Sequence, residues 1–199
     1  MTESISLIGH HPAPMRALPT RLEGPILLEP EIHRDNRGFF IESYRASVLA
    51  DLGVEEEWVQ DNHSRSGRGI VRGMHFQPGM AKLVNCARGE VLDVLVDLRK
   101  GSPTFGQWEA FRLNDENLHQ LYCPDGFGHG FCVTSEVADV LYKCSAYYDR
   151  DAERGLAYDD PEVGIEWPDL KLVPSERDAN APLLRDVKSE LPFVYEPRT

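Results

Sequence analysis

The stretch GIVRGMHFQPGMAKLVNCARGEVLDVLVDL (69–98) decides the fold. Its last eight residues alternate around Asp93 and Asp97, and short runs of this kind fill most of 58–148. They are separated by turn sequences at SGRG (66–69), ARGE (87–90), KGSP (100–103) and PDGFG (124–128). Many short strands with closely spaced turns are typical of a β-sandwich or barrel. The sequence therefore predicts an all-β domain, with a jelly roll among the candidates.

The segments on either side have other patterns. YRASVLADLGV (44–54) has helical apolar spacing and ends at Gly53, so we expect a short helix there. The first twenty residues contain three prolines and no periodicity, which indicates a flexible or strand-adding arm. Beyond residue 149 the pattern is irregular.

Composition excludes several classes of protein. The chain has 199 residues and a net charge of -12, which argues against binding to DNA or RNA. An anionic ligand would need cations gathered locally. We find no signal peptide and no apolar run of the ~20 residues needed to span a bilayer, so we expect a cytoplasmic protein. The four cysteines lack CxxC spacing, and we expect Cys86, Cys132 and Cys144 to be buried thiols.

Two motifs of cupin barrels are partly present. The first motif has the template G-x5-H-x-H-x4-E-x6-G. This chain matches it at Gly69, His75 and Gly89, but has Gln77 for the second histidine and Lys82 for the glutamate. In the second motif, G-x5-P-x-G-x2-H-x3-N, the matching positions are Pro124, Gly126 and His129. The matches support the barrel.

The departures from the first motif bear on metal binding. A cupin metal needs about three or four nitrogen and oxygen ligands, whereas this chain retains His75 and His129 and has an ammonium group at Lys82. A protonated lysine repels a cation and has no lone pair to donate. We therefore expect no metal at this site.

Several long blocks closely resemble the dTDP-4-dehydrorhamnose 3,5-epimerase family. They are RGFFIESYR (37–45), VQDNHSRSGRGIVRGMHFQ (59–77), KLVNCARGEVLDVLVDLRKGSPTFGQW (82–108), PDGFGHGF (124–131) and DDPEVGIEWP (159–168). The resemblance runs from about residue 22 to 185. It implies a cupin-type jelly-roll domain at 22–185, an arm at 1–21, a tail at 186–199, a few short peripheral helices, and a homodimer without cofactor.

The resemblance also implies roles for individual residues. The base is expected at His75 with Asp178 behind it, the acid at Tyr142, and a catalytic cation at Lys82. The expected substrate contacts are Arg37, Glu42, Gln60, Asp61, Asn62, Arg72, His129, Glu153 and Arg177, with Arg37 and Glu42 reaching the nucleotide across the dimer. Relatives often carry lysine at position 177.

These residue types suit epimerisation next to a ketone. Removing the weakly acidic proton leaves charge on the carbonyl oxygen, so the reaction needs a base, a cation at that oxygen and an acid on the opposite face. Histidine is suited to the base role by its intrinsic pKa, and an aspartate behind it fixes the tautomer. A preorganised charge such as Lys82 is worth about 3–4 kcal/mol in comparable sites.

Each residue also has a structural interpretation. His75 alone could be a hydrogen-bonded core histidine, Tyr142 a barrel-filling aromatic, and Asp178 a turn residue. Arg72 and Lys82 could be solvated charges at strand edges, although beside His129 they suit a diphosphate. Phe39 and Tyr148 could stack on the thymine or pack in the core.

Three functions remain open. The first is conversion of dTDP-4-dehydro-6-deoxy-D-glucose to dTDP-4-dehydro-L-rhamnose by inversion at C3 and C5. The second is inversion at one carbon in another deoxysugar pathway, because FQPGMA (76–81) is shorter than in many rhamnose-pathway relatives. The third is a non-catalytic sugar-nucleotide-binding cupin, which would not need this acid–base set.

Overall fold

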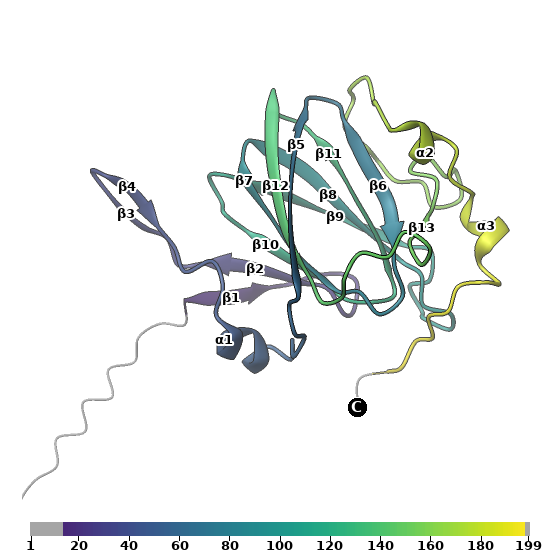
Figure 1. The fold of residues 1–199 in the computed structure, drawn as a ribbon, viewed down its shortest axis with the longest axis horizontal. Coiled ribbons are helices and arrows are strands. Elements are labelled where there is room, and N and C mark those ends of the chain that lie inside the picture. Colours follow the sequence, from purple (N-terminus) through teal and green to yellow (C-terminus); the bar gives the residue numbers. More distant parts are fainter. Residues whose placement is uncertain (1–13, 198–199) are drawn as a thin grey trace, which may run out of the picture.

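The computed structural model describes residues 14–197, which form two packed antiparallel sheets (Figure 1). The six-stranded sheet has the order β1 (Met15–Leu18), β2 (Ile26–Pro30), β10 (Gln120–Cys123), β7 (Lys82–Arg88), β12 (Val137–Cys144), β5 (Gln60–Gly67). The five-stranded sheet has the order β13 (Arg154–Gly155), β6 (Val71–Phe76), β11 (Phe127–Val133), β8 (Glu90–Asp97), β9 (Trp108–Asn114). The predicted all-β, cupin-type jelly roll is confirmed.

The main core lies between the two sheets. Val84 and Val140 from the six-stranded sheet pack with Val91, Leu95 and Phe131 from the five-stranded sheet. Strand residues that point to one face recur every second position. The inter-sheet space therefore receives one set of side chains from each strand, as the alternation predicted.

Strand β8 is buried on both faces. Val91 and Leu95 point into the space between the sheets, while Val94 and Val96 belong to a second apolar cluster on the outer face. That cluster is completed by the irregular C-terminal region, through Leu156, Val163, Leu184, Leu191 and Phe193. This region also contains α2 (Glu176–Ala179) and α3 (Leu184–Val187). The apolar run of β8 is explained by this double coverage.

The predicted helix is confirmed as α1 (Ala46–Asp51). Its buried face centres on Leu49, which packs with Val54, Leu28 and Tyr122 against the outer face of the six-stranded sheet. Gly53 follows the helix with a φ of 82°, a conformation that suits glycine just after a helix end. The three predicted buried thiols are also confirmed, since all four cysteines of the described part are buried and free.

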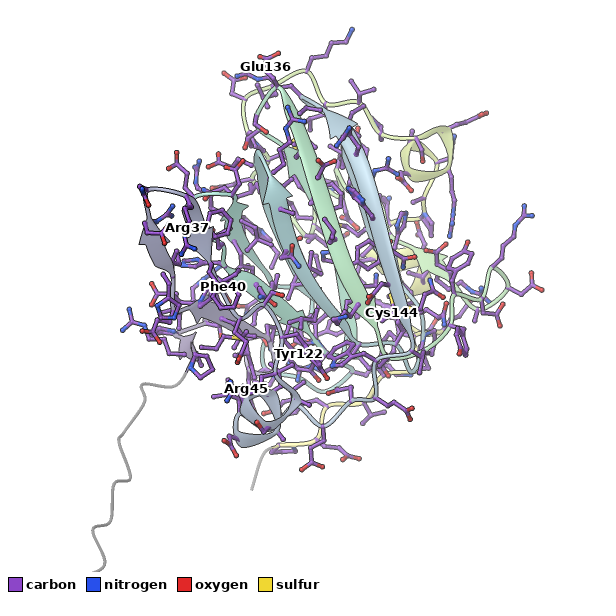
Figure 2. All side chains as sticks on the ribbon, turned by 60° about the vertical axis from the view of Figure 1, so that its left-hand side comes forward. Arg37, Phe40, Arg45, Tyr122, Glu136 and Cys144 are labelled. Atoms are coloured by element: carbon purple, nitrogen blue, oxygen red, sulfur yellow. The ribbon has the colours of Figure 1, made fainter. Side chains whose placement is uncertain are left out.

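The hairpin of β3 (His33–Asp35) and β4 (Gly38–Phe40) projects away from the two sheets (Figure 1). Its aromatic residues are exposed, at 50% for Phe39 and 69% for Phe40. Figure 2 shows Arg37 and Phe40 on this hairpin, at the side of the molecule. An apolar tip of this kind is suited to contact with another protein surface.

Residues 1–13 of the expected arm lie outside the described residues. Met15–Leu18, further along the arm, pairs with β2 at the edge of the six-stranded sheet. At the other end, Leu191 and Phe193 pack on the five-stranded sheet. The division into an arm, a domain and a tail stays a prediction.

Across residues 14–197, no helix has the length and apolar character required to cross a membrane.

Gly89, the last position of the first motif, forms a crowded turn. Its φ is 73°, and a Cβ built there would lie 2.0 Å from the Val137 carbonyl oxygen. Gly79 has nearly the same φ, 78°, but a Cβ there would meet no atom within 4 Å. The two glycines share the backbone conformation and differ in available space.

We expect Gly89→Ala to lower the free energy of unfolding by about 3 kcal/mol or more, because overpacking against backbone adds to conformational strain. Gly79→Ala should cost only the strain, about 1–2 kcal/mol. Urea unfolding of both variants measures the difference. Equal losses in the two variants would show that the contact with Val137 is relieved at no cost.

Candidate active site

An open cavity of about 500 Å³ lies between the two sheets at one end of the sandwich. Eight of the thirteen predicted site residues line it: Arg72, His75, Lys82, His129, Tyr142, Glu153, Arg177 and Asp178. They come from both sheets, from α2 and, for Glu153, from the residue before β13. The fold thus brings together residues more than 100 positions apart.

His75 and Asp178 form a hydrogen-bonded pair. His75 lies on β6, and its Nε2 atom is 2.6 Å from Asp178 Oδ1. Helix α2 carries Asp178, and the Asp178 backbone N–H donates to the N-cap Ser175 Oγ at 3.1 Å. With Nε2–H donated to the carboxylate, His75 keeps its lone pair on Nδ1. This arrangement fixes the orientation of the imidazole and leaves Nδ1 able to accept a proton.

The Asp178 carboxyl is buried, and burial alone would raise its pKa. Hydrogen bonds and attraction from His75, with help from Ser175 and the Gly73 backbone, outweigh burial and hold the pKa of Asp178 below its ordinary value. The carboxylate is therefore ionised at neutral pH. Its contribution to stability is present above the ordinary aspartate pKa and is lost as the pH falls through the lowered value.

His129 forms a second pair that the sequence analysis missed. Its Nε2 atom lies 2.9 Å from Oδ2 of Asp93, and the Asp93 side chain is fully buried. Asp93 lies on β8, whose neighbours Val91 and Leu95 are core residues. A carboxylate inside an apolar strand was the available signal, but the sequence analysis used it only as part of the alternation. Buried carboxylates need such a partner.

The opposite wall of the cavity belongs to the six-stranded sheet. It contributes Lys82 from β7 and Tyr142 from β12. These two strands are neighbours, and Lys82 lies opposite Cys144, two residues along β12 from Tyr142. Burial, the largest influence, raises the pKa of Tyr142, and Arg72 and Asn62 only partly offset it. The phenol is therefore protonated at neutral pH and can donate a proton. His75 and Tyr142 thus face the cavity from different sheets.

The rim of the cavity contains a charged network. Glu153 Oε2 accepts hydrogen bonds from Arg177 and from the Tyr148 hydroxyl, the latter at 3.2 Å. Arg72 Nε donates to Ser66 Oγ at 3.0 Å. Arg72, Lys82 and Arg177 thus gather positive charge at one cavity of an acidic chain, as the sequence predicted for an anionic ligand.

Gln60 and Asn62 lie beside this cavity. Both line a smaller cavity of about 40 Å³ that shares Lys82 and Tyr142 with the main one. Asp61 lies between them on β5, so its side chain points to the other face, where it is 3.0 Å from Lys143 Nζ. Substrate contact by these three residues stays a prediction.

The last two predicted residues lie outside the cavity of their own chain. Arg37, on the projecting hairpin, pairs with Asp35, and Glu42 pairs with Arg45. Within the described residues neither lines the main cavity or the smaller one beside it. Substrate contact by Arg37 and Glu42 stays a prediction.

The residues present do not fit a cupin metal. The Nε2 atoms of His75 and His129 already face carboxylates at 2.6 and 2.9 Å, and Lys82 lines the same cavity. Gln77, at the template position of the second histidine, bonds to the backbone of 147–149. An ammonium group repels a cation and donates no lone pair, and residues 14–197 contain no group of three or more His, Cys, Asp or Glu side chains that could hold a metal ion.

Comparison with known proteins identifies the family. The family model described as dTDP-4-dehydrorhamnose 3,5-epimerase matches residues 19–186. A Pseudomonas aeruginosa enzyme of that name is 48% identical over 174 residues, which cover 84% of this chain and 96% of the relative. A dTDP-4-dehydrorhamnose 3-epimerase of Streptomyces niveus is 43% identical over 178 residues, covering 87% and 86%.

A solved structure agrees with these relatives. The crystal structure of a Legionella pneumophila dTDP-6-deoxy-D-glucose-3,5-epimerase in complex with dTDP-4-keto-L-rhamnose has a TM-score of 0.89 and 43% identity. It covers 92% of this chain and 100% of that chain. The chain therefore belongs to the dTDP-4-dehydrorhamnose 3,5-epimerase family.

Proposed function

We propose that this protein inverts C3 and C5 of dTDP-4-dehydro-6-deoxy-D-glucose to give dTDP-4-dehydro-L-rhamnose, without a cofactor. The observation that carries the proposal is a histidine–aspartate pair and a protonated tyrosine on different walls of one cavity, with a lysine between the sheets. Inversion at carbon requires a base and an acid on opposite faces of the sugar, and the two walls supply them.

In each inversion, His75 Nδ1 takes the proton next to the 4-keto group. The C–H electron pair moves into the carbon–carbon bond, and the carbonyl electrons move to the oxygen, which becomes an enolate. Asp178 stabilises the imidazolium, and the Lys82 ammonium stabilises the enolate oxygen. Tyr142 then donates its proton to the carbon from the opposite face. As the new C–H bond forms, the enolate returns to the ketone. His75 then releases its proton to solvent, and Tyr142 takes one from solvent, before the second carbon reacts.

The cations of the cavity support a nucleotide-linked substrate. Arg72, Lys82 and Arg177 line the site, and guanidinium groups bind phosphate oxygens in a bidentate manner. We also propose a cytoplasmic location, which suits four buried free thiols in a reducing compartment.

Inversion at a single carbon is the second candidate. The observation that favours it is the short segment between His75 and Lys82, together with the similarity to the Streptomyces niveus 3-epimerase. Incubation with dTDP-4-dehydro-6-deoxy-D-glucose in D2O, followed by NMR, tests both candidates. Deuterium and inversion at C3 and C5 support the first, while a change at one carbon supports the second and overturns the first.

We expect His75→Ala to lose solvent exchange and inversion together, each by roughly 100-fold to 10,000-fold, because the base is removed. Tyr142→Phe should retain exchange while inversion is impaired, because the enolate still forms and deuterium can return from the base side. Asp178→Asn should fall between them by setting the wrong imidazole tautomer. The NMR assay in D2O measures both quantities.

His63→Ala is the control, because this exposed histidine pairs with Asp139 outside the cavity. It should exchange and invert at the wild-type rate. Wild-type exchange in His75→Ala would refute the assignment of the base, whatever the family.

Removal of metal should leave activity unchanged, because Lys82 replaces an acidic ligand and no group of three or more His, Cys, Asp or Glu side chains among the described residues could hold a metal ion. The measurement is the epimerisation rate after dialysis against EDTA and after adding back single divalent ions. Activity that is lost on chelation and restored by one ion would contradict a metal-free site.

We further propose a symmetric homodimer in which Arg37 and Glu42 complete the partner's cavity. The support is the projecting hairpin with exposed Phe39 and Phe40, which places Arg37 outside its own cavity. Such an arrangement has a specific consequence for mixed dimers, since a heterodimer of two different variants can still contain one intact site.

We expect Arg37→Ala to raise KM and to be complemented by His75→Ala. In a statistical one-to-one mixture, half the dimers are mixed and one of their two sites is intact, so about a quarter of wild-type activity should return at low substrate. The assay compares co-refolded mixtures with each variant alone. A monomer in light scattering, or no recovery on mixing, would show that Arg37 does not act across the dimer.

A further inference from the structure

Gln77 is a buried glutamine whose amide nitrogen and oxygen both hydrogen-bond to the backbone of residues 147–149. The residue is 7% exposed and directly follows the last residue of β6, two positions beyond His75. Gln77 Nε2 donates to the Tyr147 carbonyl oxygen at 3.0 Å, and Gln77 Oε1 accepts from the Asp149 backbone N–H at 2.9 Å. Because the Gln77 side chain donates one hydrogen bond to this segment and accepts another from it, the position of the segment is restrained at two points.

The residue between these two anchors is Tyr148. Its backbone N–H donates to Gln60 Oε1 at 3.0 Å, so three consecutive residues are held by two glutamine side chains. The segment itself is exposed, at 71% for Tyr147 and 51% for Tyr148. An exposed segment with little apolar burial depends on such hydrogen bonds for its order.

The side chain of Tyr148 lines the main cavity and donates to Glu153, which also pairs with Arg177. Arg177 directly precedes Asp178 in α2. The position of residues 147–149 therefore determines where one wall of the substrate cavity stands. Gln77 contacts that segment from the end of β6, the strand that carries His75.

We propose that Gln77 is a positioning residue, which holds Tyr148 in place over the cavity before the substrate arrives. Without the amide, the substrate must order the segment as it binds, and this ordering lowers affinity. The substitution leaves His75, Lys82 and Tyr142 unchanged. The lost binding free energy is therefore lost equally from the ground state and the transition state. Such a loss raises KM and leaves kcat unchanged.

The variant Gln77→Leu removes both hydrogen bonds at similar side-chain volume. We expect it to raise KM about tenfold, as two lost hydrogen bonds imply, with kcat within about twofold of wild type. In a Tyr148→Ala background the same change should raise KM by less than about twofold, because the residue being positioned is gone. If the leucine variant does not fold, Gln77→Ala replaces it in the same comparison with and without Tyr148→Ala.

Two controls separate positioning from a general loss of stability. Gln107→Leu changes an exposed glutamine away from the cavity and should leave KM and kcat unchanged. Hydrogen exchange of the Asp149 amide, measured without substrate, should be faster in Gln77→Leu than in wild type, at a temperature where both are folded.

The inference rests on the proposed function for its kinetic readout. If the wild-type protein epimerises nothing, the Kd for dTDP replaces KM in the same cycle, and Asp149 exchange still reports whether Gln77 holds the segment. An unchanged KM in Gln77→Leu would overturn the proposal, as would an equal rise in the Tyr148→Ala background. A fall in kcat at constant KM would overturn it too, since the residue would then act on the chemistry.

Discussion

The antiparallel pairing of β6 with β11 is the constraint on which the site depends. It places His75 directly opposite His129, and β13 adds Gly155 on the other side of His75. The two backbones approach so closely that a Cβ on Gly73 would lie 2.4 Å from Gly130 Cα. His75 is therefore held by strands on both sides, and a base on a rigid element keeps its geometry better than one on a loop.

Both histidines are supported by a buried carboxylate, but from different directions. Asp93 lies on the next strand of the same sheet, whereas Asp178 arrives from a four-residue helix in the irregular C-terminal region. That region also covers the outer face of β8 with Leu156, Leu184 and Phe193. The same segment thus completes the core and holds the His75 imidazole by a hydrogen bond.

The charge of the chain is distributed unevenly between the cavity and the rest of the molecule. The net charge is -12, yet three cationic side chains line one cavity. The acidic groups of the same walls are matched, Asp178 and Asp93 by histidines and Glu153 by Arg177. Matching the acids leaves the positive potential of Arg72 and Lys82 available to an anionic ligand.

The sequence by itself determined the class of fold and the residue types of the site. Alternation along β8 and turn glycines such as Gly89 are local patterns, readable within about eight residues. The motif spacing identified His75 and the substitution of Lys82 for a metal ligand. The short helix α1 was readable for the same reason, because its spacing and its terminal glycine are local.

Only the tertiary structure decided which residues meet. Asp178 lies 103 positions from His75, Asp93 lies 36 from His129, and Asp149 lies 72 from Gln77. It also decided that Tyr142 lies across the cavity from His75, on the other sheet, and that Arg37 lies outside its own cavity. Such partners depend on register and on sheet packing, where a slip of one residue turns a side chain to the opposite face. A local pattern carries no information about that choice.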